Sequence, residues 1–160
     1  MSWLRWMGVG ILAGGIGVVV GVFAARGVSR KGEIEAFNQK YIGMYLKMDT
    51  DGLLATWEEN GVDLMPGLEP MIGKSTIVKW VKGIEAGMPG YKVVKEEIGF
   101  QDIEVAGDWA SEWGNAYQAV QPPEGKPMIE SRGKIAFILH RSANGEWKVK
   151  QEMWNGSPKK

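Results

Sequence analysis

Apolar side chains recur with the 3.6-residue period of an amphipathic helix in two stretches, residues 33–48 and residues 75–86. Between them, an Asp-Thr-Asp-Gly turn at residues 49–52 ends the first helix, and its Asp or Thr can cap a short second helix. The apolar side of that short helix consists of Leu53, Leu54 and Trp57. We therefore expect three helices, with Glu58 and Glu59 on the exposed side and at the end of the second.

The rest of the soluble part has the patterns of extended strands. A strand is expected to begin at residues 62–65, directly after an Asn-Gly turn. From residue 91 onward, alternating segments separated by turn residues predict four further strands. These strands span residues 91–105, 109–120, 128–140 and 147–154. Three helices followed by an antiparallel meander predict an α+β fold in which the helices cover one face of a curved sheet.

A different pattern precedes these elements. Residues 6–25 form a run of twenty residues without a charged or strongly polar side chain, which matches the roughly 20 residues needed to span a bilayer. We expect this run to be an uncleaved transmembrane anchor; a cleaved signal is the alternative, because small residues flank Arg26. The chain then divides into an anchor and basic linker (1–32), one domain (33–156) and a short tail (157–160).

The side of the membrane stays open on this pattern. Basic residues on the domain side of the anchor favour a cytoplasmic domain, whereas an N-terminal apolar segment usually directs export of the domain behind it. Four glycines in the anchor are spaced 4-3-4 along one helix face, which would allow two anchors to pack closely. They are Gly10, Gly14, Gly17 and Gly21. Glycine is also simply common in membrane helices, and the two interpretations stand side by side.

Composition excludes several classes of function. Four of the 19 basic residues and none of the 19 acidic residues lie in residues 1–32, so residues 33–160 carry a net charge of −4. A mildly acidic domain without a Lys/Arg cluster is not expected to bind nucleic acid. The chain has no cysteine and a single histidine, His140, which excludes thiol chemistry and Cys- or His-rich metal sites. We therefore expect no metal and no cofactor.

One predicted strand carries a stripe of aromatic and polar side chains. By alternation, one face of the strand at 109–120 presents Trp109, Ser111, Trp113, Asn115 and Tyr117. On a concave sheet face this stripe would line a mostly apolar pocket with a few hydrogen-bonding groups. Alternatively, the face packs under the helices and leaves no void.

An ordered set of short motifs accompanies these elements. In chain order they are Tyr41, Asp49-x-Asp-Gly-Leu-Leu, Ile72-Gly-Lys-Ser, Gly107-Asp-Trp-Ala, Gly145-Glu-Trp-Lys-Val and Trp154-Asn155. Together they resemble the nuclear-transport-factor-2-like superfamily, in its SnoaL-like, ketosteroid-isomerase-like branch, over about residues 33–156. The resemblance implies a cone-shaped fold, a pocket between the helices and the concave sheet face, and a dimer through the convex face.

The resemblance also implies positions for catalytic groups. In the isomerase members a tyrosine of the first helix polarises the substrate, and Tyr41 fits that position. The general base would fall on Met65, and the second carboxylic acid near Ala136 or Phe137. Proton abstraction needs a base within hydrogen-bond reach. Because both carboxylates are missing, the resemblance argues against steroid isomerisation.

Three residues remain as possible functional groups. Asp63 lies two residues before Met65 and shares its strand face, so it is the best remaining acid; a solvated acid at the mouth of the cone is the favoured interpretation. Tyr41 is interpreted as a core aromatic with a satisfied hydroxyl rather than as a donor to substrate. His140 is expected on the outer face, in a dimer contact or in solvent.

The resulting hypothesis is a membrane-tethered, homodimeric cone domain that binds a small apolar ligand or a protein partner without catalysis. The expected pocket residues are Tyr41, Tyr45, Trp57, Asp63, Met65, Trp113, Asn115 and Tyr117. The alternative is a SnoaL-like isomerase, cyclase or hydratase that uses Asp63 as acid/base and Tyr41 as polarising donor. A third possibility is an interaction module with a filled cone.

Overall fold

The computed structural model describes residues 29–158, and its elements follow the predicted order. In chain order they are α1 (Arg30–Lys47), α2 (Thr50–Ala55), β1 (Trp57–Leu64), β2 (Met71–Ile72), α3 (Lys74–Gly87), β3 (Lys92–Ala106), β4 (Trp109–Gln121), β5 (Ile129–Arg141) and β6 (Trp147–Gly156). The predicted anchor at residues 6–25 lies outside this range. Within residues 29–158 no helix is both long and apolar enough to cross a membrane.

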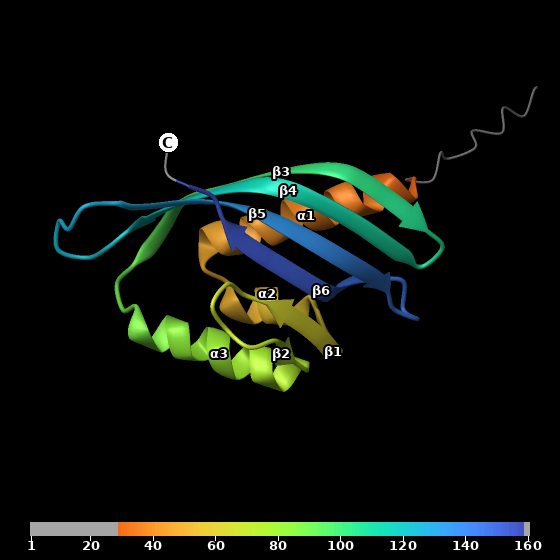
Figure 1. Ribbon diagram of the computed structural model, residues 1–160, viewed down its shortest axis with the longest axis horizontal. Helices are drawn as coiled ribbons and strands as arrows, with labels where there is room; N and C mark the ends of the chain where they lie inside the picture. Colours follow the sequence, from red (N-terminus) through yellow and green to blue (C-terminus); the bar gives the residue numbers. More distant parts are fainter. Residues whose placement is uncertain (1–28, 159–160) are drawn as a thin grey trace, which may run out of the picture.

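The six strands form one curved, unclosed sheet in the order β2-β1-β6-β5-β4-β3. Strands β3 to β6 are the predicted antiparallel meander, and β1 joins it by pairing parallel to β6. Figure 1 shows the three helices on one side of the sheet, with α1 crossing behind β3 to β5 and α3 below β1. Helix α1 packs on β3, and α3 packs on β1 and β2. The α+β architecture is therefore confirmed.

Helix α1 places one apolar stripe against the concave face. Its side-chain cap is Ser29, which accepts a hydrogen bond from the backbone of Gly32, and it ends at Met48 in the left-handed conformation. The buried residues of the helix are Ile34, Asn38, Tyr41 and Met44. Their spacing of three or four residues keeps them on one face. The ring of Tyr41 packs edge-on against Phe137 of β5, with centroids 5.2 Å apart, which fixes α1 over the middle of the sheet.

The second helix is shorter than predicted. Trp57, Glu58 and Glu59 belong to β1, and the expected Asn-Gly turn at 60–61 lies inside that strand. The local sequence pattern predicted the wrong conformation for residues 57–61 because their conformation depends on pairing with β6. Trp57 pairs with Val149, the register then shifts, and the ladder resumes at Val62. Residues 58–61 therefore form an irregular, bulged part of a strand.

Candidate functional site

A cavity of about 430 Å3 lies between the concave face of the sheet and the three helices. Every helix contributes to its wall, as do all strands except the short β2. The apolar part of the wall includes Leu53, Leu54, Trp57, Met65, Ile77, Trp80, Val81, Ile98, Ile135 and Trp154. The cone is therefore not filled, and its interior has the size and apolar character of small-molecule sites.

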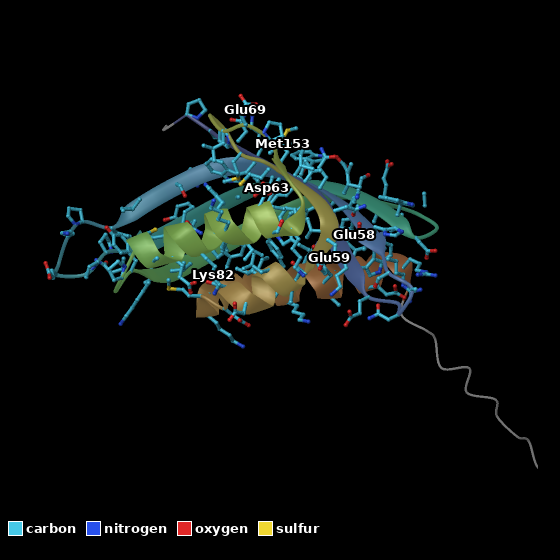
Figure 2. All side chains as sticks on the ribbon, turned by 90° about the horizontal axis from the view of Figure 1, so that it is seen from below. Glu58, Glu59, Asp63, Glu69, Lys82 and Met153 are labelled. Carbon is cyan, nitrogen blue, oxygen red and sulfur yellow. The ribbon has the colours of Figure 1, made fainter. Side chains whose placement is uncertain are left out.

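Three carboxyl groups reach into this apolar space from three different strands. They belong to Asp63 of β1, Glu96 of β3 and Glu152 of β6. Asp63 and Glu152 are direct partners in the parallel ladder between β1 and β6, so their backbones are adjacent. Figure 2 shows Asp63 between β1 and α3, whereas Met153, the neighbour of Glu152, lies on the other side of the sheet.

Asp63 is buried, in contrast to the expected solvated acid at the cone mouth. Only 4% of the residue is exposed, and among the described residues nothing forms a hydrogen bond with its Oδ1 atom. Burial raises the pKa of Asp63 to about 6, against the opposing effect of the Leu64 backbone N–H. The expected position was wrong because the irregular segment at 58–61 carries the strand from the rim into the cavity before Asp63 is reached.

Glu152 is held from the opposite wall by Tyr41. The Tyr41 hydroxyl donates to Glu152 Oε2 over 3.0 Å, and both side chains are buried. Burial and then the charge of Asp63 raise the pKa of Glu152 to about 8, although the hydrogen bond from Tyr41 opposes this. Burial and Glu152 raise the pKa of Tyr41 well above its ordinary value. Tyr41 is thus a core aromatic whose hydroxyl is satisfied, and it also lines the cavity.

Glu96 is the third carboxyl group of the cavity. Its Oε2 atom accepts a hydrogen bond of 2.8 Å from Gln118, its direct partner on β4. Burial raises the pKa of Glu96 to about 7, and the hydrogen bond from Gln118 lowers it in part. Because the pKa values of Asp63, Glu96 and Glu152 are raised to between about 6 and about 8, these acids change protonation state around neutral pH.

No lysine, arginine or histidine is among the described residues that line the cavity. Nor does the described part of the chain contain three acidic or histidine side chains grouped closely enough to hold a metal ion. The cavity is therefore acidic without an internal cationic partner.

Five of the eight predicted pocket residues line the cavity, namely Tyr41, Tyr45, Trp57, Asp63 and Met65. The other three, Trp113, Asn115 and Tyr117, do not. Trp109, Ser111, Trp113 and Asn115 are exposed, so the predicted stripe faces outward and its assignment to the pocket was wrong. Ladder pairing explains this, because Glu112 of β4 lies opposite Phe137, which is buried beneath the helices, and directly paired residues share a face.

Sequence reasoning missed Glu96, Gln118 and Glu152. Irregular register in two strands hid the two acids. The ladder between β3 and β4 shifts between Val93 and Lys95, and that between β5 and β6 shifts where Leu139 pairs with Val149. Each shift moves the following residues to the opposite face, so strict alternation assigns both acids to the wrong side. Gln118 was missed because the sequence did not show which face of β4 points toward the cavity.

The remaining sequence candidates lie away from the cavity. His140 is on the outer face, as expected. Its ring lies tilted against that of Trp109 with centroids 4.3 Å apart, and its Nδ1 atom contacts Glu58. The resemblance places a second carboxylic acid near Ala136 or Phe137, and of these two residues Phe137 packs against Tyr41. The carboxyl groups that line this cavity therefore come from other positions.

No protein-family model and no curated protein sequence matches this chain. Solved structures share the fold at low sequence identity. A ketosteroid isomerase-like protein from Erwinia carotovora atroseptica has a TM-score of 0.65 and 19% identity, and covers 78% of this chain and 95% of its own. An NTF2-like protein from Cytophaga hutchinsonii has a TM-score of 0.65 and 12% identity, over 81% and 99% of the two chains.

A third similar structure was solved with a small molecule. It is a protein from Catenulispora acidiphila in complex with S-DNPA, with a TM-score of 0.63 and 13% identity over 78% of this chain and 90% of its own. These likenesses show that the described domain has the NTF2-like, ketosteroid isomerase-like fold that the sequence motifs predicted.

Proposed function

We propose that this chain is a membrane-tethered domain that binds a small, largely apolar organic molecule in the cavity between its sheet and its helices. The observation that carries the proposal is the cavity itself, because about 430 Å3 of apolar space lies where a filled core would be more stable. A few polar groups on the wall, from Asp63, Glu96, Gln118 and Glu152, would orient the ligand.

The fold adds general support. One protein with this fold was solved in complex with a small molecule, S-DNPA. Its identity to this chain is 13%, so the ligand of that protein does not transfer to this one. We infer binding from the residues of this cavity.

Two variants, each with one alanine replaced by phenylalanine, test the proposal. Ala116 lines the cavity, and Ala116→Phe would fill part of it; Ala86 is exposed on α3, and Ala86→Phe is the matched control. Native mass spectrometry of detergent-solubilised full chain is expected to detect a co-purified ligand in the wild type and in A86F. The same ligand should be strongly reduced in folded A116F. Equal ligand content in both variants would place the binding site elsewhere.

Acid–base catalysis is the second candidate function, and a specific observation favours it. Asp63 and Glu152 are adjacent in the β-ladder, and burial raises their pKa values to about 6 and about 8. Near pH 7 Asp63 can accept a proton while Glu152 holds one, which is the division of roles that a proton-transfer reaction needs. Tyr41 would then position Glu152 by its hydrogen bond rather than polarise the substrate directly.

The two functions differ in what Asp63→Asn removes. For a binding domain, D63N changes affinity only. For an isomerase, cyclase or hydratase, D63N would abolish conversion of a bound substrate and leave that substrate intact in the cavity, as mass spectrometry of the extracted ligand would show.

Membrane attachment through residues 6–25 and homodimer formation belong to the same proposal. The outer sheet face supports a dimer because it carries exposed apolar side chains on neighbouring strands. Trp113 of β4 and Met153 of β6 flank Ala136 in one cross-strand row, and Ile138 is nearby. Exposed apolar side chains that lie next to one another are often found at protein–protein contacts.

A further inference from the structure

The charge of the cavity narrows the class of ligand that it can hold. The strands of the wall present three carboxyl groups, and a fourth, Glu85 of α3, is paired with Lys82. Among the described residues that line the cavity there is no cationic side chain. Acidic residues inside apolar cavities are costly unless they are paired. A ligand that supplies the missing positive charge would therefore gain more from this wall than a neutral or anionic one.

Asp63 provides a second, independent sign of a missing partner. Its residue is 96% buried, it lines the cavity, and its Oδ1 atom has no hydrogen-bond donor among the described residues. Buried polar atoms in folded proteins nearly always have a partner. The free oxygen atom therefore marks a place where a ligand donor would fit.

Three lysines of the elements around the cavity are engaged in other contacts. Lys82 of α3 lies outside the cavity wall and binds Asp51 and Glu85 at 2.9 Å and 3.1 Å. Lys148 and Lys150 of β6 donate to backbone oxygen atoms of Ala55 and Asn60 on the outer side. These contacts hold the three ammonium groups away from the cavity acids, and no cationic side chain is among the described residues of the lining.

On these grounds we infer that the cavity selects an amphiphilic organic cation, an apolar or aromatic body that carries a protonated amine. This inference rests on the proposed ligand-binding function and names the chemical class of the ligand. An ammonium group has three N–H donors and no acceptor, which suits a wall of carboxyl oxygens. A carboxylate or phosphate on the ligand would be repelled by the ionised carboxyl groups of the wall, of which Asp63 has the lowest pKa.

The aromatic part of the wall favours the same class. Tyr41, Tyr45, Trp57, Trp80 and Trp154 all line the cavity. Aromatic faces attract cations, and they also pack well against an apolar body. A bare metal ion has no apolar body to pack against these rings, and the described carboxylates are not grouped as a metal site.

Proton release should accompany binding of such a cation. The titratable groups that line the cavity are Tyr41 and Tyr45 of α1, Asp63 of β1, Tyr91 before β3, Glu96 of β3 and Glu152 of β6, with Glu85 of α3 at the rim. The three interior acids have pKa values raised to between about 6 and about 8. An ammonium group would stabilise their charged forms, so they would lose protons as it binds. Affinity for the amine should therefore fall as the pH is lowered from 8 to 5.5.

Three probes with one hydrocarbon skeleton test the inference on the full chain in detergent. Naphthylmethylamine is cationic, naphthylmethanol is neutral and naphthylacetate is anionic at pH 8. Calorimetric titration is expected to show the amine binding at least about tenfold more tightly than the alcohol, and the acid more weakly than both. At pH 5.5 the preference for the amine should largely disappear, whereas the affinity for the alcohol should not change.

Variants of the buried acids show which carboxyl groups cause the preference for the amine. The D63N/E152Q double variant should bind the alcohol like the wild type and lose most of its preference for the amine. Glu112 is the matched control, because it is buried, has a raised pKa and does not line the cavity, so E112Q should keep the preference. Equal or tighter binding of the alcohol by the wild type at pH 8 would overturn the inference and leave the binding function intact. If none of the three probes binds, the proposed function fails as well.

Discussion

At the scale of single residues, the unusual feature of this domain is its set of buried acids. Asp63, Glu96, Glu112 and Glu152 are each at most 9% exposed, and burial is the first cause of the raised pKa of each. A buried carboxylate is costly unless it is paired, so such groups are kept where they have a use. Three of the four line the cavity, which is why we connect them with ligand binding.

Glu112 gives a prediction about stability and pH. Its ordinary pKa of 4.5 is raised to about 7 in the folded state, where Asn38 donates to it over 2.8 Å. Below pH 4.5 the Glu112 carboxyl group is protonated in both the folded and the unfolded protein. Between pH 4.5 and 7 it is protonated only in the folded protein. The free energy of unfolding therefore falls as the pH rises through this window, by at most about 3 kcal/mol for a shift of this size.

Replacing Glu112 by Gln removes that dependence. The difference in unfolding free energy between E112Q and the wild type should grow in favour of E112Q from pH 4.5 to pH 8. Urea unfolding at several pH values measures it. A difference that stays constant with pH, or that grows in favour of the wild type, would mean that Glu112 is not a protonated buried acid at neutral pH.

At the scale of elements, the sequence predicted the features that depend on local period and turn chemistry. The helical periods around Tyr41 and Ile77 and the turns at 107–108 and 144–145 matched the structure because neighbouring residues determine them. The sheet face on which each strand side chain lies could not be predicted in the same way. The acids Glu96 and Glu152 follow register shifts that only pairing with another strand reveals, so they could not be placed from alternation.

Gly133 of β5 shows how closely the elements pack at one end of the cavity. A Cβ atom there would lie 2.8 Å from the ring of Trp154 and 2.8 Å from the backbone oxygen of Asn155. Gly133→Ala should therefore displace Trp154 and lower the free energy of unfolding by roughly 1–3 kcal/mol. Urea unfolding followed by circular dichroism measures this loss.

Gly83 in α3 is the matched control for this substitution. A Cβ atom at Gly83 would meet nothing within 4 Å, so Gly83→Ala should raise stability by roughly 0.5–1 kcal/mol through helix propensity. If G133A were as stable as G83A, the close approach of β5 to the Trp154 ring would not hold in solution.

At the scale of the whole molecule, the proposed function combines a cavity, an outer apolar row and a tether. The fold was predictable because the order of three helices and a meander, together with the motif set, is typical of cone-shaped domains. The residues that line the cavity were predictable only in part, because they come from segments far apart in the chain. Tyr41 and Glu152, for example, are 111 residues apart and form a hydrogen bond.

The dimer is testable with single cysteines, because the chain has none of its own. Met153 is 47% exposed on the outer row, and Leu68 is 49% exposed in the loop between β1 and β2. If two copies pair through the outer sheet face, Met153→Cys should be cross-linked by a short bismaleimide in the full chain. Leu68→Cys should react with the reagent without forming a cross-linked dimer. Similar cross-linking of both variants on denaturing gels would argue against a dimer through this face.

The central claim is that the space between sheet and helices is the ligand site, and intermolecular nuclear Overhauser effects test it most directly. With methyl-labelled isoleucine, bound naphthylmethylamine should give effects to Ile77 and Ile135, which line the cavity. It should give none to Ile72 and Ile138, which are 69% and 38% exposed and outside the cavity wall. Effects confined to Ile72 or Ile138 would contradict the claim, because the ligand would then lie on the surface of the domain.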